Sequence, residues 1–148
     1  HNSLVDSLVP EFVEIGDNFI SAPGSIILAH DASLLIQFGE YRVQKTVIGN
    51  NVFLGANAVV LARVTIGDGA IIGAGSVVTK DVRANMVVGR NPAREISTVE
   101  AYRNKCKEKN ILIKAPDSFS KIFAGETLSA ADIEELRKSA QNHFKPHK

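Results

Sequence analysis

The histidine at position 30 is the first residue to consider for chemistry, because it is the one histidine that stands away from the chain ends. The other three, His1, His143 and His147, lie close to the two termini. An unperturbed imidazole titrates near pH ~6.5, so it can accept a proton from a hydroxyl or an amine at neutral pH. His30 is followed directly by Asp31. Position alone leaves two interpretations open: a general base, or an ordinary histidine on a surface loop.

A six-residue repeat predicts the elements that must hold this histidine. From position 48 onward, six successive hexads begin with an aliphatic residue and carry a small or β-branched residue in fifth place. A helix with period 3.6 or a strand with period 2 does not produce this pattern, whereas a short strand followed by a tight turn does. We therefore predict a parallel β-helix of triangular coils, three hexads to a coil. The first positions of the hexads are Ile48, Leu54, Val60, Ile66, Ile72 and Val78.

The composition agrees with such a coil. Successive coils stack about 4.8 Å apart, so aliphatic residues 18 positions apart form columns in the interior. Burial of a Val, Leu or Ile side chain contributes roughly 1.5–3 kcal/mol, so these columns can hold a domain that is 45% apolar but only 6% aromatic.

The repeat is weaker before position 48 and loses its frame there. Hexads are expected to begin at Val9, Ile15, Ser21 and Ile27, the last with Asp31 at its inward fifth position. A carboxylate facing the interior is costly, so we expect the coil to break at His30. We also expect a loop at about residues 33–46, and a loop of this length in a regular fold is usually functional. Its candidate contact residues for acceptor or donor are Phe38, Glu40, Tyr41 and Arg42, which could equally serve only to close the loop.

The chain after residue 96 is expected to be helical. Ser97 and Glu100 have the spacing of a capping box and predict a helix to about Lys109, and Ser129 with Asp132 predicts the start of a second. The domains are then a β-helix at residues 9–96 and a helical extension at residues 97–148.

Charge and cysteine content exclude several classes of partner. The 17 basic and 16 acidic residues nearly cancel, so we expect neither nucleic acid nor an anionic membrane as partner, and no apolar run reaches the ~20 residues of a membrane span. The single Cys106 cannot form an internal disulfide, which favours a cytoplasmic setting, and we expect it to pack in a helix and not to act as a nucleophile. Because the only methionine is Met86, the sequence is interpreted as a fragment, without a visible signal peptide.

Together, the hexads, the His30–Asp31 pair before a loop, and the segments IGAGSVVTKDV and VVGRNPAR resemble the hexapeptide-repeat acyltransferases. Within this superfamily the chain is most similar to sugar O-acetyltransferases, including those of polysaccharide biosynthesis, and to galactoside, maltose and xenobiotic acetyltransferases. The resemblance covers residues 15–96. It implies a left-handed parallel β-helix and a homotrimer with active sites between subunits, where acetyl-CoA lies along the groove.

The resemblance also implies roles for individual residues. His30 is the general base for the acceptor hydroxyl, and Lys80 and Arg94 supply the cations that a phosphate-rich donor needs. Asp31 or Glu40 could orient the imidazole. The galactoside type has a proline where this chain has Asp31, so contacts with the acceptor are expected to differ. The full set of implied residues is Ala56, Ala74, Thr79, Lys80 and Arg94 for acetyl-CoA, and Asp31, Glu40 and Tyr41 for the acceptor.

The expected reaction is direct acetyl transfer without an acyl-enzyme, with a backbone N–H of the coil stabilising the oxyanion. Three alternatives stay open: an amino-sugar N-acetyltransferase, a non-catalytic trimeric β-helix scaffold, and a zinc-dependent carbonic anhydrase on the same coil. The last needs about three histidine ligands and the repeat offers only His30, so we expect no metal.

Overall fold

The computed structural model describes residues 3–145, so His1 and His147 lie outside the described residues. The chain divides into two compact units, and the division falls between Arg103 and Asn104. Each unit is described by itself.

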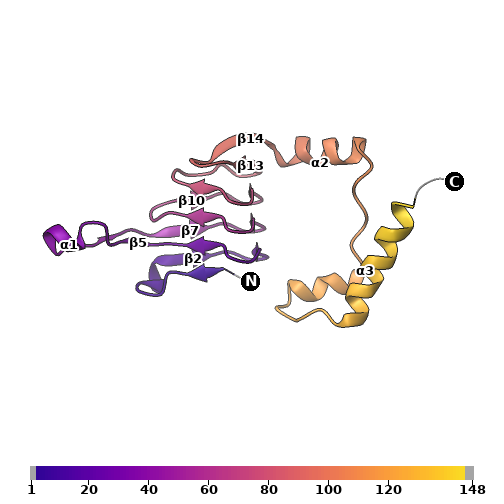
Figure 1. Ribbon diagram of the computed structural model, residues 1–148, viewed down its shortest axis with the longest axis horizontal. Helices are drawn as coiled ribbons and strands as arrows, with labels where there is room; N and C mark the ends of the chain where they lie inside the picture. The colour runs from indigo at the N-terminus through magenta and orange to yellow at the C-terminus, as the bar shows by residue number, and fades with distance from the viewer. Residues whose placement is uncertain (1–2, 146–148) are drawn as a thin grey trace. The chain divides into compact units, whose positions relative to one another are not determined.

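The first unit is a parallel β-helix, as the six-residue repeat predicts (Figure 1). Short strands stack in register on three faces, and each coil contributes one strand to each face. The first face contains β1 (Leu4–Val5), β4 (Ile26–Ile27), β9 (Val59–Val60) and β12 (Val77–Val78). The second contains β2 (Val13–Ile15), β7 (Thr46–Ile48) and β10 (Thr65–Ile66). The third contains β3 (Ile20–Ser21), β8 (Phe53–Leu54), β11 (Ile71–Ile72) and β13 (Met86–Gly89).

The interior of the coil is filled by the first and fifth positions of the hexads. The aliphatic first residues from Ile48 to Val78 are at most 1% exposed. Their columns are formed by parallel pairing at a spacing of 18 residues, as between Leu54 and Ile72. The fifth residues are buried between them and include Val52, Ala58 and Ser76. The predicted inward positions are therefore confirmed.

The first coil differs from the predicted frame. Val5, and not Val9, pairs with Ile27, so the hexad expected to begin at Val9 is wrong. The additional residues form η1, a 3₁₀ turn at Pro10–Phe12. Proline fixes its own φ and suits the first position of such a turn, which moves the preceding residues out of the six-residue frame.

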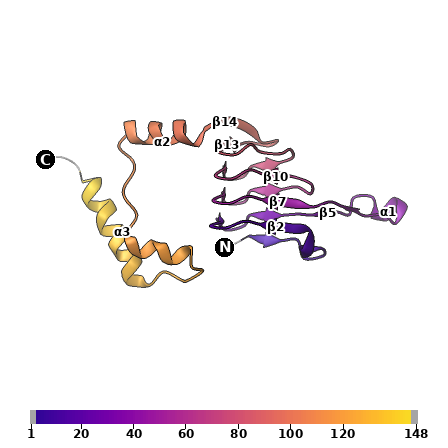
Figure 2. The ribbon, with the colours of Figure 1, turned by 180° about the vertical axis from the view of Figure 1, so that it is seen from behind.

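A hairpin leaves the coil at His30, where the sequence predicts a break. β5 (His30–Asp31) pairs antiparallel with β6 (Arg42–Val43), and α1 (Leu35–Phe38) lies at the tip (Figure 2). The coil resumes where the Gln44 N–H donates to the Ala29 carbonyl at 2.9 Å. The insertion is thus His30–Gln44, displaced from the expected residues 33–46.

Thr46 explains why the coil closes so well across this insertion. Its side chain is buried at the fifth position that the sequence assigned to Asp31, and its hydroxyl donates to the Leu28 carbonyl at 2.7 Å. Asp31 itself is only half-buried on the hairpin, so the break at His30 avoids a carboxylate that faces the interior, as expected.

The corners of the coil share one turn geometry. Four of them, beginning at residues 55, 61, 67 and 73, are closed by an N–H of the fourth residue that donates to the carbonyl of the first. The third residue of each turn has a positive φ, a conformation that glycine and asparagine tolerate best. These third residues are Asn57, Arg63, Gly69 and Gly75.

The last coil is capped by β14 (Arg94–Thr98), which runs antiparallel to β13. The predicted helix begins at Val99, so Ser97 lies in a strand and not at a helix cap. The Thr98 hydroxyl caps the helix instead, by accepting the Ala101 N–H at 3.1 Å. This helix is α2 (Val99–Glu108), and it buries Cys106.

The second unit contains η2 (Asp117–Ile122) and α3 (Ala130–His143). The predicted capping box of α3 is present: the Asp132 N–H donates to Ser129 Oγ at 3.2 Å, and the Ser129 N–H donates to Asp132 Oδ2 at 2.7 Å. Among residues 3–145, no helix has the length and apolar character needed to cross a membrane.

Candidate active site

His30 is paired with Asp6, a residue of the first coil. The imidazole Nδ1 lies 2.5 Å from Asp6 Oδ2. The Asp6 side chain is buried, and Oδ2 also accepts the backbone N–H groups of Ala29 and His30 at 2.8 and 3.0 Å. Oδ1 accepts those of Leu8 and Val9 at 2.9 and 3.1 Å. The carboxylate is therefore fixed by the backbone on both sides of the histidine.

These hydrogen bonds keep Asp6 ionised. Burial alone would raise its pKa, but the N–H groups of Ala29, Val9 and Leu8 and the contact with His30 outweigh burial, and the pKa lies well below its ordinary value. An ionised carboxylate only accepts hydrogen bonds, so the network assigns the imidazole proton to Nδ1. Nε2 is then free to accept a proton, which is the arrangement of a general base held by a carboxylate.

His30 lines an open hollow of about 280 Å³ where the hairpin leaves the coil. Its side chain is 23% exposed. The hairpin contributes His30, Asp31, Ala32 and Arg42 to the wall, and the coils contribute Leu28, Leu61 and Ala62. A small acceptor can therefore reach the histidine from solvent, over a floor that is mostly apolar.

Asp31 does not orient the imidazole, contrary to one sequence-based expectation. Its Oδ1 accepts the Ser33 N–H at 2.8 Å, and its Oδ2 accepts from Arg42 Nη2 at 2.8 Å. The hydrogen bonds from Ser33, followed by the charge of Arg42, lower the pKa of Asp31. Asp31 and Arg42 face each other across β5 and β6, so this ion pair is part of the wall of the hollow.

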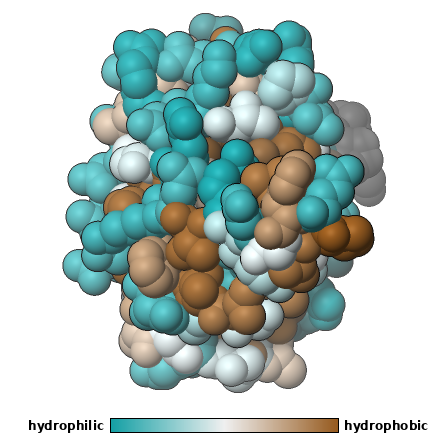
Figure 3. All heavy atoms as spheres, turned by 90° about the vertical axis from the view of Figure 1, so that its left-hand side faces the viewer, coloured by the Kyte–Doolittle hydropathy of each residue, from teal (hydrophilic) through white to brown (hydrophobic). Residues whose placement is uncertain are grey.

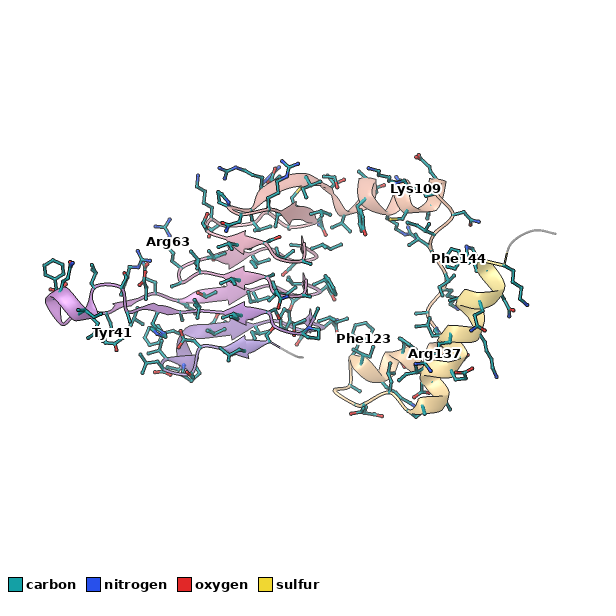
Figure 4. All side chains as sticks on the ribbon, viewed as in Figure 1. Tyr41, Arg63, Lys109, Phe123, Arg137 and Phe144 are labelled. Atoms are coloured by element: carbon teal, nitrogen blue, oxygen red, sulfur yellow. The ribbon has the colours of Figure 1, made fainter. Side chains whose placement is uncertain are left out.

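The other two acceptor candidates are placed differently. The Tyr41 ring lies 6.2 Å from the His30 ring between centroids, and Figure 4 shows Tyr41 on the hairpin. Glu40 is exposed and, within the described chain, is not among the residues that line the hollow. Asp6, and not Glu40, holds the imidazole.

Asp6 was missed because the repeat loses its frame in the first coil. The available signal was a single carboxylate within the otherwise apolar and serine-containing segment LVDSLV, at residues 4–9. An acidic residue there is either exposed or committed to a specific partner. The sequence alone does not name that partner, because the insertion of η1 changes which residues stack.

The residues expected to contact acetyl-CoA lie at two corners of the coil. Thr79 and Lys80 follow β12, which stacks on β9 and β4, so they share the corner of His30. Ala56 and Ala74 lie at the preceding corner, where the Gly75 N–H donates to the Ala56 carbonyl at 2.8 Å. Arg94 pairs with Gly89, at the end of β13 above that second corner. One chain therefore does not bring these five residues together.

Within residues 3–145, the structure contains no group of three or more His, Cys, Asp or Glu side chains that could hold a metal ion.

Comparisons with known proteins identify the class to which this parallel β-helix and its histidine–carboxylate pair belong. Residues 45–80 match the family described as bacterial transferase hexapeptide (six repeats). The protein YvoF of Bacillus subtilis (strain 168), named as a candidate acetyltransferase, is 43% identical over 103 residues, which cover 70% of this chain and 58% of that protein. Galactoside O-acetyltransferase of Escherichia coli (strain K12) is 40% identical over 90 residues, covering 59% of this chain and 44% of that protein.

A solved structure agrees with these relatives. Galactoside acetyltransferase in complex with coenzyme A superimposes with a TM-score of 0.61 at 34% identity, covering 76% of this chain and 55% of that one. The resemblance to the hexapeptide-repeat acyltransferases, and within them to sugar O-acetyltransferases, is therefore confirmed. The chain spans about half the length of the curated relatives it matches.

Proposed function

We propose that this protein is an acetyl-CoA-dependent O-acetyltransferase that acts on a hydroxyl of a sugar or a polysaccharide precursor. The observation that carries the proposal is the contact between Asp6 Oδ2 and His30 Nδ1, made by a histidine that lines an open hollow. A buried, ionised carboxylate that fixes one nitrogen of an accessible imidazole leaves the other as a base. The names of the relatives support acetyl transfer as the reaction.

The mechanism follows from this pair. The acceptor hydroxyl donates its proton to His30 Nε2 while its oxygen attacks the thioester carbonyl. The C–O bond forms, the C–S bond breaks, and the imidazolium returns the proton to the departing thiolate. Asp6 stabilises the imidazolium between these steps, and a backbone N–H of the coil stabilises the oxyanion. No acyl-enzyme is formed.

The donor residues support an active site shared between subunits. Thr79 and Lys80 lie at the His30 corner, whereas Ala56, Ala74 and Arg94 lie at another. In a homotrimer of left-handed β-helices, the second corner of one subunit would face the His30 corner of its neighbour, and acetyl-CoA would lie in the groove between them. Lys80 and Arg94 then provide positive charge for its phosphates.

The apolar surface of the hairpin supports the same trimer. Seen from the side of the hairpin, Figure 3 shows apolar side chains gathered on one face. Ile36 is 96% exposed, and its neighbours Leu34, Leu35 and Phe38 are exposed as well. Exposed apolar side chains concentrated on one protruding segment are typical of an interface. We assign a second copy of this chain as the occupant.

The hollow suits a sugar-type acceptor. Its apolar floor at Leu28, Leu61 and Ala62 can pack against the C–H face of a ring, and the Asp31–Arg42 pair offers an acceptor and donors for ring hydroxyls. The Tyr41 ring provides a further surface beside His30. Because acetyl-CoA is a metabolite of the cytoplasm, we propose that the reaction takes place there.

The experiment is release of free thiol from acetyl-CoA with a panel of sugars and amino sugars, comparing the parent chain with His30→Ala. The variant is expected to keep its fold and its affinity for CoA and to lose most of its transfer activity. Unchanged turnover would remove His30 from the mechanism, and transfer to amino groups alone would indicate N-acetylation. Failure of the parent chain to bind CoA would favour a scaffold.

A further inference from the structure

Arg63 occupies a corner position that the neighbouring turns of the coil give to glycine or asparagine. It is the third residue of the turn from Leu61 to Val64 and has a φ of 74°. The same position is Asn57, Gly69 or Gly75 in the turns before and after. A side chain with a Cβ is strained at positive φ, and such strain in a folded protein is more often found at functional sites. The arginine therefore needs a reason other than the turn itself.

The corner of Arg63 lies between the coil of His30 and the coil of Lys80. Leu61 and Ala62, its two predecessors, line the hollow beside His30. Figure 4 shows the Arg63 side chain projecting from the corner on the side where the hairpin leaves the coil. Arg63 and His30 thus belong to adjacent coils, which are spaced ~4.8 Å apart, and they lie at the same corner.

Three carboxylates of the hairpin and the coil have partners other than Arg63. Asp31 is paired with Arg42, Asp6 is buried against His30, and Asp81 accepts the Thr65 N–H at 2.8 Å. Lys45, a cation of the returning chain, is paired with Glu14. Within residues 3–145, Arg63 itself forms no ion pair. Arg63, which directly follows the wall residue Ala62, therefore carries a positive charge that no carboxylate contact in the described residues balances.

We propose that Arg63 binds an anionic oxygen group of the acceptor, so that the preferred acceptor is an acidic sugar that carries a phosphate or a carboxylate near the reacting hydroxyl. This inference rests on the proposed function and names the substrate class of the same site. A planar guanidinium makes two parallel hydrogen bonds with either group, which gives orientation as well as attraction.

The length of the donor argues that this anion belongs to the acceptor. The pantetheine arm between the thioester sulfur and the first phosphate contains about as many bonds as four residues of extended chain, roughly 15 Å. When the thioester lies at His30, an extended arm carries the phosphates well beyond the neighbouring coil. Arg63 directly follows Ala62 in the wall of the hollow, so we assign the anion that it binds to the acceptor.

The test compares glucose, glucose 1-phosphate and glucuronate as acceptors for the parent chain, Arg63→Gly and Arg63→Lys. The parent chain is expected to show a kcat/KM at least 10-fold higher for the two acidic sugars than for glucose. Arg63→Gly should lose this preference while its KM for acetyl-CoA and its kcat with glucose stay within about 2-fold, and Arg63→Lys should keep part of it. Because glycine relieves the positive φ, Arg63→Gly is expected to unfold at the same or a higher temperature.

Arg90→Gly is the matched control, since Arg90 is the other arginine at positive φ, 81°, and lies at a different corner. It should leave the preference between acidic and neutral sugars unchanged. The inference is overturned if the parent chain shows no preference, if the preference survives in Arg63→Gly, if that variant changes only the KM for acetyl-CoA, or if it lowers kcat equally for all three sugars. If the parent chain acetylates sugars without a preference, the proposed function stands and only this inference fails. If it transfers acetyl groups to no sugar, the result counts against the proposed function itself.

Discussion

The carboxylate of Asp6 and the imidazole of His30 meet at 2.5 Å although they are 24 positions apart in the chain. The contact is possible because Val5 stacks on Ile27, which brings the residues that follow each of them to the same corner. The same corner is where the hairpin leaves the coil. The fold thus uses one interruption of its repeat both to expose a histidine and to place a buried carboxylate behind it.

Replacement of Asp6 by asparagine separates the charge of this pair from its shape. Asp6→Asn is expected to lower kcat by about 10²-fold or more, because the amide cannot stabilise an imidazolium and favours the wrong tautomer of His30. The measurement is kcat and KM for acetyl-CoA, with the pH profile of kcat/KM. The KM for acetyl-CoA should change little, since the contacts of Asp6 are with His30 and with the N–H groups of Leu8, Val9 and Ala29.

The control for that variant is Asp68→Asn, which removes a carboxylate that accepts the Asn50 N–H at 2.7 Å and lies at a different corner from His30. It should leave kcat within about 2-fold of the parent value. Equal losses in the two variants would mean that Asp6 acts only through the fold.

The stability of the protein should depend on the ionisation of Asp6 at acid pH. Its pKa is lowered by folding, so the unfolded chain binds more protons as the pH falls, and the free energy of unfolding falls with it. The stabilisation is complete well above the unfolded pKa of about 3.9, and it is lost progressively as the pH falls from about 5 toward the folded pKa. Urea unfolding between pH 2.5 and 7 measures it, and Asp6→Asn should flatten the curve.

Asp132 in the second unit gives the comparison for this measurement. Its pKa is lowered mainly by the hydrogen bond from Lys121, at 2.8 Å. Asp132→Asn should therefore flatten the unfolding curve of the helical part without affecting transfer. A curve that stays steep in Asp6→Asn would show that Asp6 is not the group that titrates.

The repeat predicts the coil well because burial is periodic. Each hexad must place an aliphatic residue inward and a small residue beside it, and positions such as Leu54 and Ala58 report this directly. The break at His30 could also be predicted, because a carboxylate at Asp31 would otherwise face the interior. Periodicity is a local property, so it holds wherever coils follow each other without an insertion.

The partners across insertions could not be predicted, because they depend on how many residues each insertion adds. The turn at Pro10–Phe12 shifts the first coil, so Val5 replaces Val9 in the stack and Asp6 comes to lie against His30. For the same reason the inward fifth position of this hexad, which the sequence assigns to Asp31, is occupied by Thr46 after the hairpin. The sequence pattern therefore predicts His30 as the base, whereas its partner Asp6 is identified only from the three-dimensional register of the coils.

Lys80 is expected to act through charge on the donor. Lys80→Ala should raise the KM for acetyl-CoA by about 10-fold with little change in kcat, because the interaction with phosphate oxygens is the same in the ground state and the transition state. The parent KM should also rise with ionic strength, and that dependence should weaken in the variant. Lys138→Ala, an exposed position of α3 in the second unit, is the control and should change neither value. A fall in kcat at constant KM would place Lys80 in the chemistry and not in donor binding.

Ile36 tests whether the hairpin joins subunits. It is the most exposed of the large apolar side chains in the described residues, at 96%, and lies in α1 at the hairpin tip. Ile36→Glu should break a trimer, because a carboxylate buried against a neighbouring subunit without a partner is strongly unfavourable. Sedimentation should shift from near three times 15.9 kDa to near 15.9 kDa. Acetyl transfer should fall with it, because the donor residues at the two corners would no longer face each other, while the coil itself stays folded.

Phe144→Glu, at an exposed apolar position of the second unit, is the control and should leave the mass unchanged. A parent chain that sediments as a monomer, or a trimer that survives Ile36→Glu, would show that the apolar surface of the hairpin has another partner.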